Sequence, residues 1–187
     1  MTHAAPSGGG TVETDERLRL FLALLLPEDV VATLLGWGTR HLDRGRRIES
    51  LHVTLAFLGS QPRSRLEAIC SALGDASAGA TPFSLSIARY RETRSVGMLV
   101  LDDPSREATR LAERLHIGLE ELGVYERERR RWLPHVTVLR FRERPRLAPP
   151  LPGIEPFAPS GAAAFLSRLH PSGARYEVLE RYELGVR

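Results

Sequence analysis

Two copies of the tripeptide His-Val-Thr carry the residues of this chain that are best suited to acid–base chemistry. They lie in the segments "SLHVTLAFLG" and "LPHVTVLRF", and their histidines, His52 and His135, are 83 positions apart. Each tripeptide sits in an apolar run of strand length, and residues i and i+2 of a strand project from the same face. We therefore expect His52 to share a face with Thr54, and His135 to share one with Thr137.

Such a set of side chains matches the needs of phosphodiester hydrolysis. Two imidazoles that titrate near neutrality supply a general base and a general acid together. One would activate water, the other would protonate the leaving alkoxide, and the threonine hydroxyls would donate hydrogen bonds to non-bridging oxygens. A single strand histidine is more often a packing residue than a catalyst. The repetition of the whole tripeptide in equivalent contexts favours the paired-catalyst interpretation.

The elements around the two motifs repeat in the same order. Each motif strand follows a strand and then a helix: strand 17–26 and helix 27–42 before the first motif, strand 96–101 and helix 103–123 before the second. A helix over 62–76 and an alternating strand over 82–90 separate the two units, and strands 162–169 and 175–184 flank a "HPSG" turn. The alternating strands and the closing hairpin indicate antiparallel pairing. The predicted fold is α+β, bilobal and duplicated, with two mainly antiparallel sheets flanked by outer helices around a central cleft.

Composition and charge narrow the classes of protein. The length of 187 residues fits one bilobal domain over residues 17–187, preceded by a disordered tail at 1–16 that lacks a signal-peptide pattern. No apolar stretch approaches the ~20 residues that span a bilayer, which predicts a cytoplasmic protein without a membrane partner. The single cysteine, Cys70, excludes an intramolecular disulfide and a cysteine-based zinc site. All 26 basic residues are arginines, but the net charge is only +3, so any attraction to nucleic acid must be local.

The chain also resembles a known family, the two-histidine (2H) phosphoesterases, and within it the RNA 2′,3′-cyclic phosphodiesterases formerly called 2′-5′ RNA ligases. The similarity runs in order from "RLFLALLLPEDV" through both motifs to "FLSRLHPSGARYEVLERYEL", about residues 17 to 184. It implies an RNA 2′,3′-cyclic 3′-phosphodiesterase that opens the cyclic phosphate to a 2′-phosphomonoester, with two HxTx motifs and without a metal or other cofactor. It further implies that the protein acts on RNA 3′ ends or cyclic nucleotides. We expect a monomer.

The resemblance assigns roles to five residues of this sequence. His52 and His135 match the catalytic histidines, with His52 as the acid for the 3′ oxygen and His135 as the base for water. Thr54 and Thr137 match the phosphate-binding hydroxyls, and Arg140 matches an arginine near the nucleotide. Without the resemblance, Arg140 would be interpreted as an exposed arginine at a strand end.

Other features leave alternatives open. Eight arginines lie between Arg127 and Arg146, as either a solvated charged face or a rim for the RNA backbone. Asp102 and Asp103 could suggest a metal site, but Asp103 before Pro104 is better interpreted as a helix N-cap. The same cleft could act on a 2′,5′-linked oligonucleotide or an ADP-ribose cyclic phosphate, or the protein could be a non-catalytic module that binds RNA ends. Intact histidines and threonines in both motifs disfavour the binding module, which needs no acid–base pair.

Overall fold

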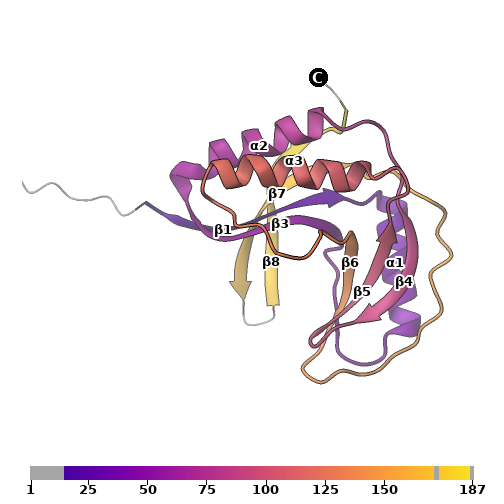
Figure 1. Cartoon of the computed structure of the whole chain (residues 1–187). Coiled ribbons are helices and arrows are strands. Elements are labelled where there is room, and N and C mark those ends of the chain that lie inside the picture. The colour runs from indigo at the N-terminus through magenta and orange to yellow at the C-terminus, as the bar shows by residue number, and fades with distance from the viewer. Residues whose placement is uncertain (1–14, 171–172, 186–187) are drawn as a thin grey trace, which may run out of the picture.

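The centre of the molecule is a curled antiparallel sheet (Figure 1). The computed structural model describes residues 15–170 and 173–185. Within them the sheet has eight strands in the order β4-β5-β6-β3-β1-β7-β8, with β2 pairing with β6. The strands are β1 (Arg17–Leu25), β2 (Arg46–Arg47), β3 (His52–Pro62), β4 (Ser86–Glu92), β5 (Val96–Asp102), β6 (His135–Arg140), β7 (Gly161–His170) and β8 (Gly173–Tyr182).

The sheet has two halves, which meet where the two motif strands touch. Strands β3 and β6 pair at one position, Val53 with Val136, in antiparallel orientation. Beyond β3 lie β1, β7 and β8, and beyond β6 lie β5 and β4. The short strand β2 pairs with the end of β6 along the edge that β5 leaves free. The prediction of an α+β fold with mainly antiparallel strands in two lobes is confirmed, and the two halves join into one continuous sheet at the middle residues of the two motifs.

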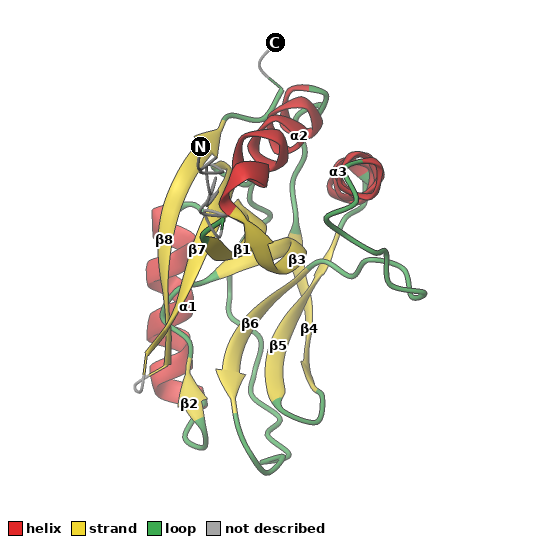
Figure 2. Ribbon diagram, turned by 90° about the vertical axis from the view of Figure 1, so that its left-hand side faces the viewer, coloured by secondary structure: helices red, strands yellow, loops and turns green. Residues whose placement is uncertain are grey.

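Three α-helices cover one face of this sheet: α1 (Glu28–His41), α2 (Leu66–Ala78), which follows a 3₁₀ turn at Arg63–Arg65, and α3 (Glu107–Glu121). Helix α1 follows β1 in the chain but packs against β4, where the rings of Trp37 and Tyr90 lie 6.4 Å apart. Helix α3 follows β5 but contacts β3, through a 2.8 Å hydrogen bond between His116 Nε2 and the carbonyl of Leu55. Each of these two helices therefore packs against the half of the sheet to which its preceding strand does not belong. Helix α3 lies beside α2 (Figures 1 and 2).

Strand β1 shows how the sequence separates the two faces of the sheet. Leu18, Leu20, Leu22 and Leu24 are buried in the main core with the helices, and we call this side the helix face. Burial of each leucine contributes about 1.5–3 kcal/mol to folding. The residues between them project to the opposite side, where Phe21 and Ala23 form a small second cluster with Ala163 and Phe165 of β7. We call that side the motif face.

Two boundaries differ from the sequence-based expectation. Asp15 and Glu16 were assigned to the tail, but they contact the 3₁₀ turn: Glu16 pairs with Arg63 at 2.9 Å, and Asp15 bonds to Ser64. Residues 1–14 of the predicted tail lie outside the described residues. Helix α3 begins at Glu107 rather than directly after Asp103, although the Asp103 carboxylate still accepts the backbone N–H of Thr109 at 2.8 Å. No helix in the described ranges is long and apolar enough to cross a membrane.

Candidate active site

The pairing of Val53 with Val136 brings the four motif side chains together. Both valines are buried on the helix face. In an antiparallel pair centred on them, His52 lies across from Thr137, and Thr54 lies across from His135. Because the residues that flank each valine project to the other side, all four polar side chains lie on the motif face. The structure thus brings together both predicted catalytic pairs at the junction of the two halves.

The two imidazoles are held in the same way. Nδ1 of His52 lies 3.0 Å from the carbonyl oxygen of Ser50, and Nδ1 of His135 lies 2.8 Å from that of Leu133. A carbonyl oxygen only accepts hydrogen bonds, so Nδ1 carries the proton in each neutral ring. Nε2 is then the unprotonated atom, able to accept a proton, and in the charged ring it becomes a donor. Each histidine is therefore oriented to serve as an acid or a base through Nε2.

The hydroxyl groups of Thr54 and Thr137 are available to a ligand. In the part of the chain that the structure describes, neither hydroxyl has a hydrogen-bond partner, and both side chains are half-buried. A half-buried hydroxyl without an internal partner is well placed to donate to a substrate oxygen.

A shift in strand register places Arg140 on the motif face. On β6 the pairing with β5 passes from Met98–Thr137 to Gly97–Leu139, which leaves Val138 as an extra residue. A bulge of this kind reverses the alternation of side chains beyond it. Arg140 pairs with Val96, which lies two residues from Met98 and so on the same face. Three positions after Thr137, an arginine therefore projects beside the histidines instead of away from them.

The first motif strand contains a matching bulge. Its pairing with β1 passes from Ala23–Thr54 to Leu22–Ala56, so Leu55 is the extra residue. Phe57, three positions after Thr54, consequently lies on the motif face opposite Phe21. Phe57 is 51% exposed, and the guanidinium of Arg19 lies 4.8 Å from the centre of its ring. Phe57 was not predicted as a site residue, although its place in "HVTLAF" corresponds to that of Arg140 in "HVTVLR".

The end of β6 that carries Arg140 is held by the backbone of β2 and of Gly45, which lie close against it. Strand β2 pairs with β6 at Arg46–Arg140. The preceding residue, Gly45, has a φ of +91°, and a Cβ there would lie 2.7 Å from the carbonyl oxygen of Arg140. Only glycine adopts this conformation at so short a distance without strain. Gly45 thus allows β2 to brace the end of β6 that carries Arg140.

His52 occupies an aromatic environment on the β7–β8 side of the site. Its ring centre lies 4.9 Å from that of Phe21, 5.8 Å from Phe165 and 5.7 Å from Tyr176. Burial among these rings lowers the pKa of His52 from 6.5 to about 4, because the charged form is poorly solvated there. The hydrogen bond to Ser50 opposes this shift, while the positive charges of His135 and Arg140 add to it. The sequence-based expectation of titration near neutrality therefore does not hold for His52 in the free protein.

His135 faces a different environment. It lines a cavity of about 700 Å³ together with Thr54, Phe57 and Trp132. Trp132 donates its indole N–H to the carbonyl oxygen of Thr54 at 3.0 Å, which fixes the wall of the cavity to β3. Six arginines also line it: Arg91, Arg106, Arg127, Arg129, Arg130 and Arg131. The two motifs are thus equivalent in backbone geometry, but one histidine is enclosed by aromatic rings and the other borders an arginine-rich cavity.

The predicted arginine cluster separates into parts with different contacts. Arg127, Arg129, Arg130 and Arg131 line the cavity, whereas Arg140 lies on the motif face. Arg144 instead binds the buried carboxylate of Glu92 at 3.1 Å, and the backbone N–H groups of Arg146 and Leu147 donate to the same group. Burial raises the pKa of Glu92, but these hydrogen bonds outweigh burial and hold the pKa below its ordinary value. That carboxylate anchors the chain that leaves β6.

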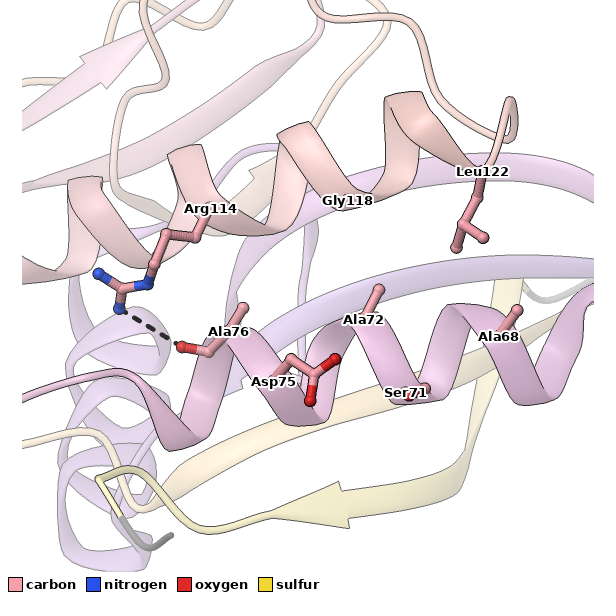
Figure 3. A pocket seen from close by; sticks show the side chains of 8 residues that line it. All are labelled: Ala68, Ser71, Ala72, Asp75, Ala76, Arg114, Gly118 and Leu122. Atoms are coloured by element: carbon pink, nitrogen blue, oxygen red, sulfur yellow. Dashed lines mark hydrogen bonds between the residues drawn. The ribbon is translucent and has the colours of Figure 1, made fainter.

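A second hollow lies away from the histidines, between α2 and α3 (Figure 3). Ala72 of α2 faces Gly118 of α3 across it, and Ala68 lies near Leu122 (Figure 3). Arg114 closes one end and donates to the carbonyl oxygen of Ala76 at 3.4 Å. The hollow contains no histidine, and its main feature is the close packing of two helices.

A two-lobed antiparallel sheet in which two His-x-Thr strands meet at one residue pair defines the class of the two-histidine phosphoesterases. Residues 26–167 match the family model of the 2′-5′ RNA ligase superfamily. The chain belongs to this superfamily. The recognition made from the two motifs is confirmed.

Individual relatives resemble the chain over almost its whole length. The RNA 2′,3′-cyclic phosphodiesterase of Thermus thermophilus is 35% identical over 181 residues, which cover 89% of this chain and 90% of the relative. The enzyme of the same name from Escherichia coli K12 is 28% identical, over 90% of this chain and 98% of the relative. The crystal structure of E. coli LigT complexed with 3′-AMP superposes with a TM-score of 0.78 at 26% identity, over 90% of this chain and 99% of that one. LigT has also been solved in complex with NADP⁺.

Proposed function

We propose that this protein hydrolyses the 2′,3′-cyclic phosphate at RNA 3′ ends, or of nucleosides, to a 2′-phosphomonoester by metal-independent acid–base catalysis. The observation that carries the proposal is the placement of His52 and His135 on one face beside the paired position Val53–Val136 of β3 and β6, each with Nδ1 bound to a backbone carbonyl. The activity named for the relatives from T. thermophilus and E. coli supports the same substrate.

The reaction needs two proton transfers, one from the attacking water to the enzyme and one from the enzyme to the leaving oxygen. A base removes a proton from water as its oxygen bonds to phosphorus, and an acid protonates the 3′ oxygen as the bond from phosphorus to that oxygen breaks. We assign the base to Nε2 of His135 and the acid to Nε2 of His52. His135 borders the open cavity, from which water can enter, whereas His52 is enclosed by aromatic rings.

The acid role requires His52 to be protonated when the substrate is bound. In the free protein its pKa of about 4 keeps the ring neutral at pH 7. The cyclic phosphate carries a negative charge, and an opposite charge within hydrogen-bond distance raises the pKa of an imidazole. Substrate binding thus supplies the protonated acid, and the burial of His52 makes its proton readily transferable.

The remaining side chains of the site bind the phosphate and the nucleoside. Thr54 and Thr137 donate their hydroxyls to the non-bridging oxygens, whose negative charge grows in the transition state. Arg140 adds a guanidinium on the same face and forms no ion pair with any described carboxylate. Phe57 offers an exposed ring on which a base can stack.

Turnover of 2′,3′-cyclic AMP in excess EDTA tests the proposal. We expect hydrolysis at the same rate with and without the chelator, because both proton transfers and all phosphate contacts come from side chains. Loss of turnover in EDTA, with recovery on addition of a divalent metal, would contradict the metal-independent mechanism. Binding of the nucleotide without turnover in either condition would favour a non-catalytic RNA-end-binding module. Turnover of only a 2′,5′-linked dinucleotide or an ADP-ribose cyclic phosphate would assign another substrate to the same cleft.

A further inference from the structure

The arginine-lined cavity beside His135 concentrates the positive charge of the protein. Six arginines and two glutamates, Glu113 and Glu128, line it, an excess of four positive charges. The whole chain has a net charge of only +3. The local attraction for anions is therefore set here, in a hollow that adjoins the motif residues Thr54 and His135.

Several of these arginines are free of internal ion pairs. Arg127 is bound to Glu120 at 3.0 Å, and Arg130 is bound to Glu128 at 2.6 Å. Arg91, Arg106, Arg129 and Arg131 form no ion pair with any carboxylate of the described residues, and all four are exposed. Exposed guanidinium groups without a carboxylate partner are available to bind phosphate, which they grip with a planar pair of donors.

The loop that carries four of the six arginines, Arg127, Arg129, Arg130 and Arg131, is attached at both ends. At its start, the backbone N–H and the guanidinium of Arg127 both bind the carboxylate of Glu120 on α3, at 3.1 and 3.0 Å. At its end, Trp132 is bonded to the carbonyl oxygen of Thr54. Arg129 and Arg131 lie between these two attachments, so their backbone is held at the mouth of the cavity.

Arg106 reaches the cavity from another element and in an unusual conformation. It precedes α3 with a φ of 58°, in the left-handed region that costs a non-glycine residue ~1–3 kcal/mol. Arg91 approaches from β4, opposite Met98, which also lines the cavity. Three segments that are distant in sequence therefore place guanidinium groups around one hollow.

The cavity also presents flat rings among the positive charges. Phe57, Tyr125 and Trp132 are among its lining residues. A positively charged groove with interspersed aromatic side chains is the usual means of binding single-stranded nucleic acid, because arginines follow the backbone and bases stack on the rings.

We infer that this cavity binds the RNA strand on the 5′ side of the nucleotide that carries the cyclic phosphate. A 2′,3′-cyclic phosphate is the end of its chain, so every other phosphate of the substrate is attached through the 5′ oxygen of that nucleotide. An anion-binding hollow next to the catalytic pair can therefore contact only 5′ phosphates when the cyclic phosphate lies between the histidines. The inference rests on the proposed function and adds that the enzyme prefers an oligonucleotide to a cyclic mononucleotide.

The experiment compares three substrates: 2′,3′-cyclic AMP, the same nucleotide with a 5′ phosphate, and the trinucleotide ApApA with a 2′,3′-cyclic phosphate. We expect kcat/KM to be at least about tenfold higher for the trinucleotide than for cyclic AMP at low salt. This advantage should fall as salt rises, by ~0.7 in log–log slope for each phosphate contact of a single strand. A full advantage from the lone 5′ phosphate would limit the site to one phosphate and would overturn the assignment to a strand.

A pair of matched double variants tests the residues. R129Q/R131Q removes two unpaired arginines of the cavity, and R40Q/R65Q removes two exposed arginines that do not line it. We expect the ratio of kcat/KM for the trinucleotide to that for cyclic AMP to fall about tenfold or more in R129Q/R131Q and to stay unchanged in R40Q/R65Q. An equal fall in both variants would indicate a general charge effect and would overturn the site.

A second matched pair of variants separates the effect of the Arg106 guanidinium on RNA binding from the effect of its left-handed backbone conformation. R106G relieves the left-handed conformation and removes a cavity side chain, whereas R146G relieves the same conformation, also at φ 58°, outside the cavity. The trinucleotide-to-mononucleotide ratio should fall in R106G alone. If wild-type protein hydrolyses cyclic AMP but shows no preference for the trinucleotide, the inference fails while the proposed function stands. If the wild type hydrolyses neither substrate, the proposed function itself fails.

Discussion

Replacing either motif histidine by alanine is expected to lower kcat/KM for 2′,3′-cyclic AMP by about 10²–10⁴-fold, the usual loss when a proton-transfer group is removed. His52 and His135 should give losses of similar size, because the reaction needs both the proton taken from water and the proton given to the leaving oxygen. Thr54→Ala and Thr137→Ala should leave a larger remainder, since each hydroxyl is one of several donors to the phosphate. Initial rates from product chromatography give the comparison.

His41→Ala is the matched control. His41 lies at the end of α1, and its ring contacts Trp37 rather than the motif residues. The kcat/KM of the His41→Ala variant for 2′,3′-cyclic AMP should stay within about twofold of the wild-type value. Because His52 packs against aromatic rings, thermal unfolding of His52→Ala and of the polar variant His52→Gln should be recorded beside the rates. Near-normal turnover in a folded His52 or His135 variant would contradict the catalytic assignment.

His52 is expected to bind its proton more than a hundredfold more weakly than an ordinary histidine, with a pKa of about 4 in the free protein. Burial among Phe21, Phe165 and Tyr176 is the main cause. An NMR titration of the imidazole ¹H–¹³C signals, assigned by their loss in His52→Gln, measures it. Bound 2′-AMP should raise the pKa by ~1–3 units, because its phosphate places an opposite charge beside the ring. A free-protein pKa near 6.5, or no rise with 2′-AMP, would contradict the enclosed position beside the phosphate.

The same pKa has a consequence for stability. The unfolded chain binds a proton at His52 below pH ~6.5, but the folded chain does so only below about pH 4. The folded state therefore loses stability as the pH falls from 6.5 to 4, and this contribution is constant outside that window. His52→Gln, which does not titrate at this position, should lose less stability over the same window in urea unfolding. An identical loss in both proteins would argue against the depressed pKa.

The sequence alone predicts some features of the two motif strands but not others. The alternation around His52 and His135 predicted two strands with the polar residues on one face, and β3 and β6 both begin at those histidines. The predicted antiparallel, two-lobed α+β fold is confirmed. Arg140 was linked to the site only through family resemblance, because strict alternation would have placed it on the face opposite Thr137. The bulge at Val138 that returns it to the motif face depends on pairing with β5.

The surroundings of each histidine could not be predicted because they come from distant parts of the chain. The rings that lower the pKa of His52 belong to β1, β7 and β8, and their approach depends on the order of strands in the sheet. The arginines around Arg129 were predicted as a possible binding rim for the RNA backbone. Arg91 and Arg106 line the same cavity, but they lie in segments without a recognisable motif and were not predicted. The exchange of α1 and α3 between the halves likewise follows from packing across the sheet.

Hydrolysis of 2′,3′-cyclic AMP in the presence of EDTA, with the products separated against authentic 2′-AMP and 3′-AMP, tests the central claim most directly. In-line attack expels the oxygen opposite the incoming water, so the position of the acid determines which ester remains. With His52 as the acid at the 3′ oxygen and His135 as the base, we predict 2′-AMP as the predominant product, at a rate that EDTA does not change. Predominant 3′-AMP would reverse the roles of the two histidines and contradict the assignment.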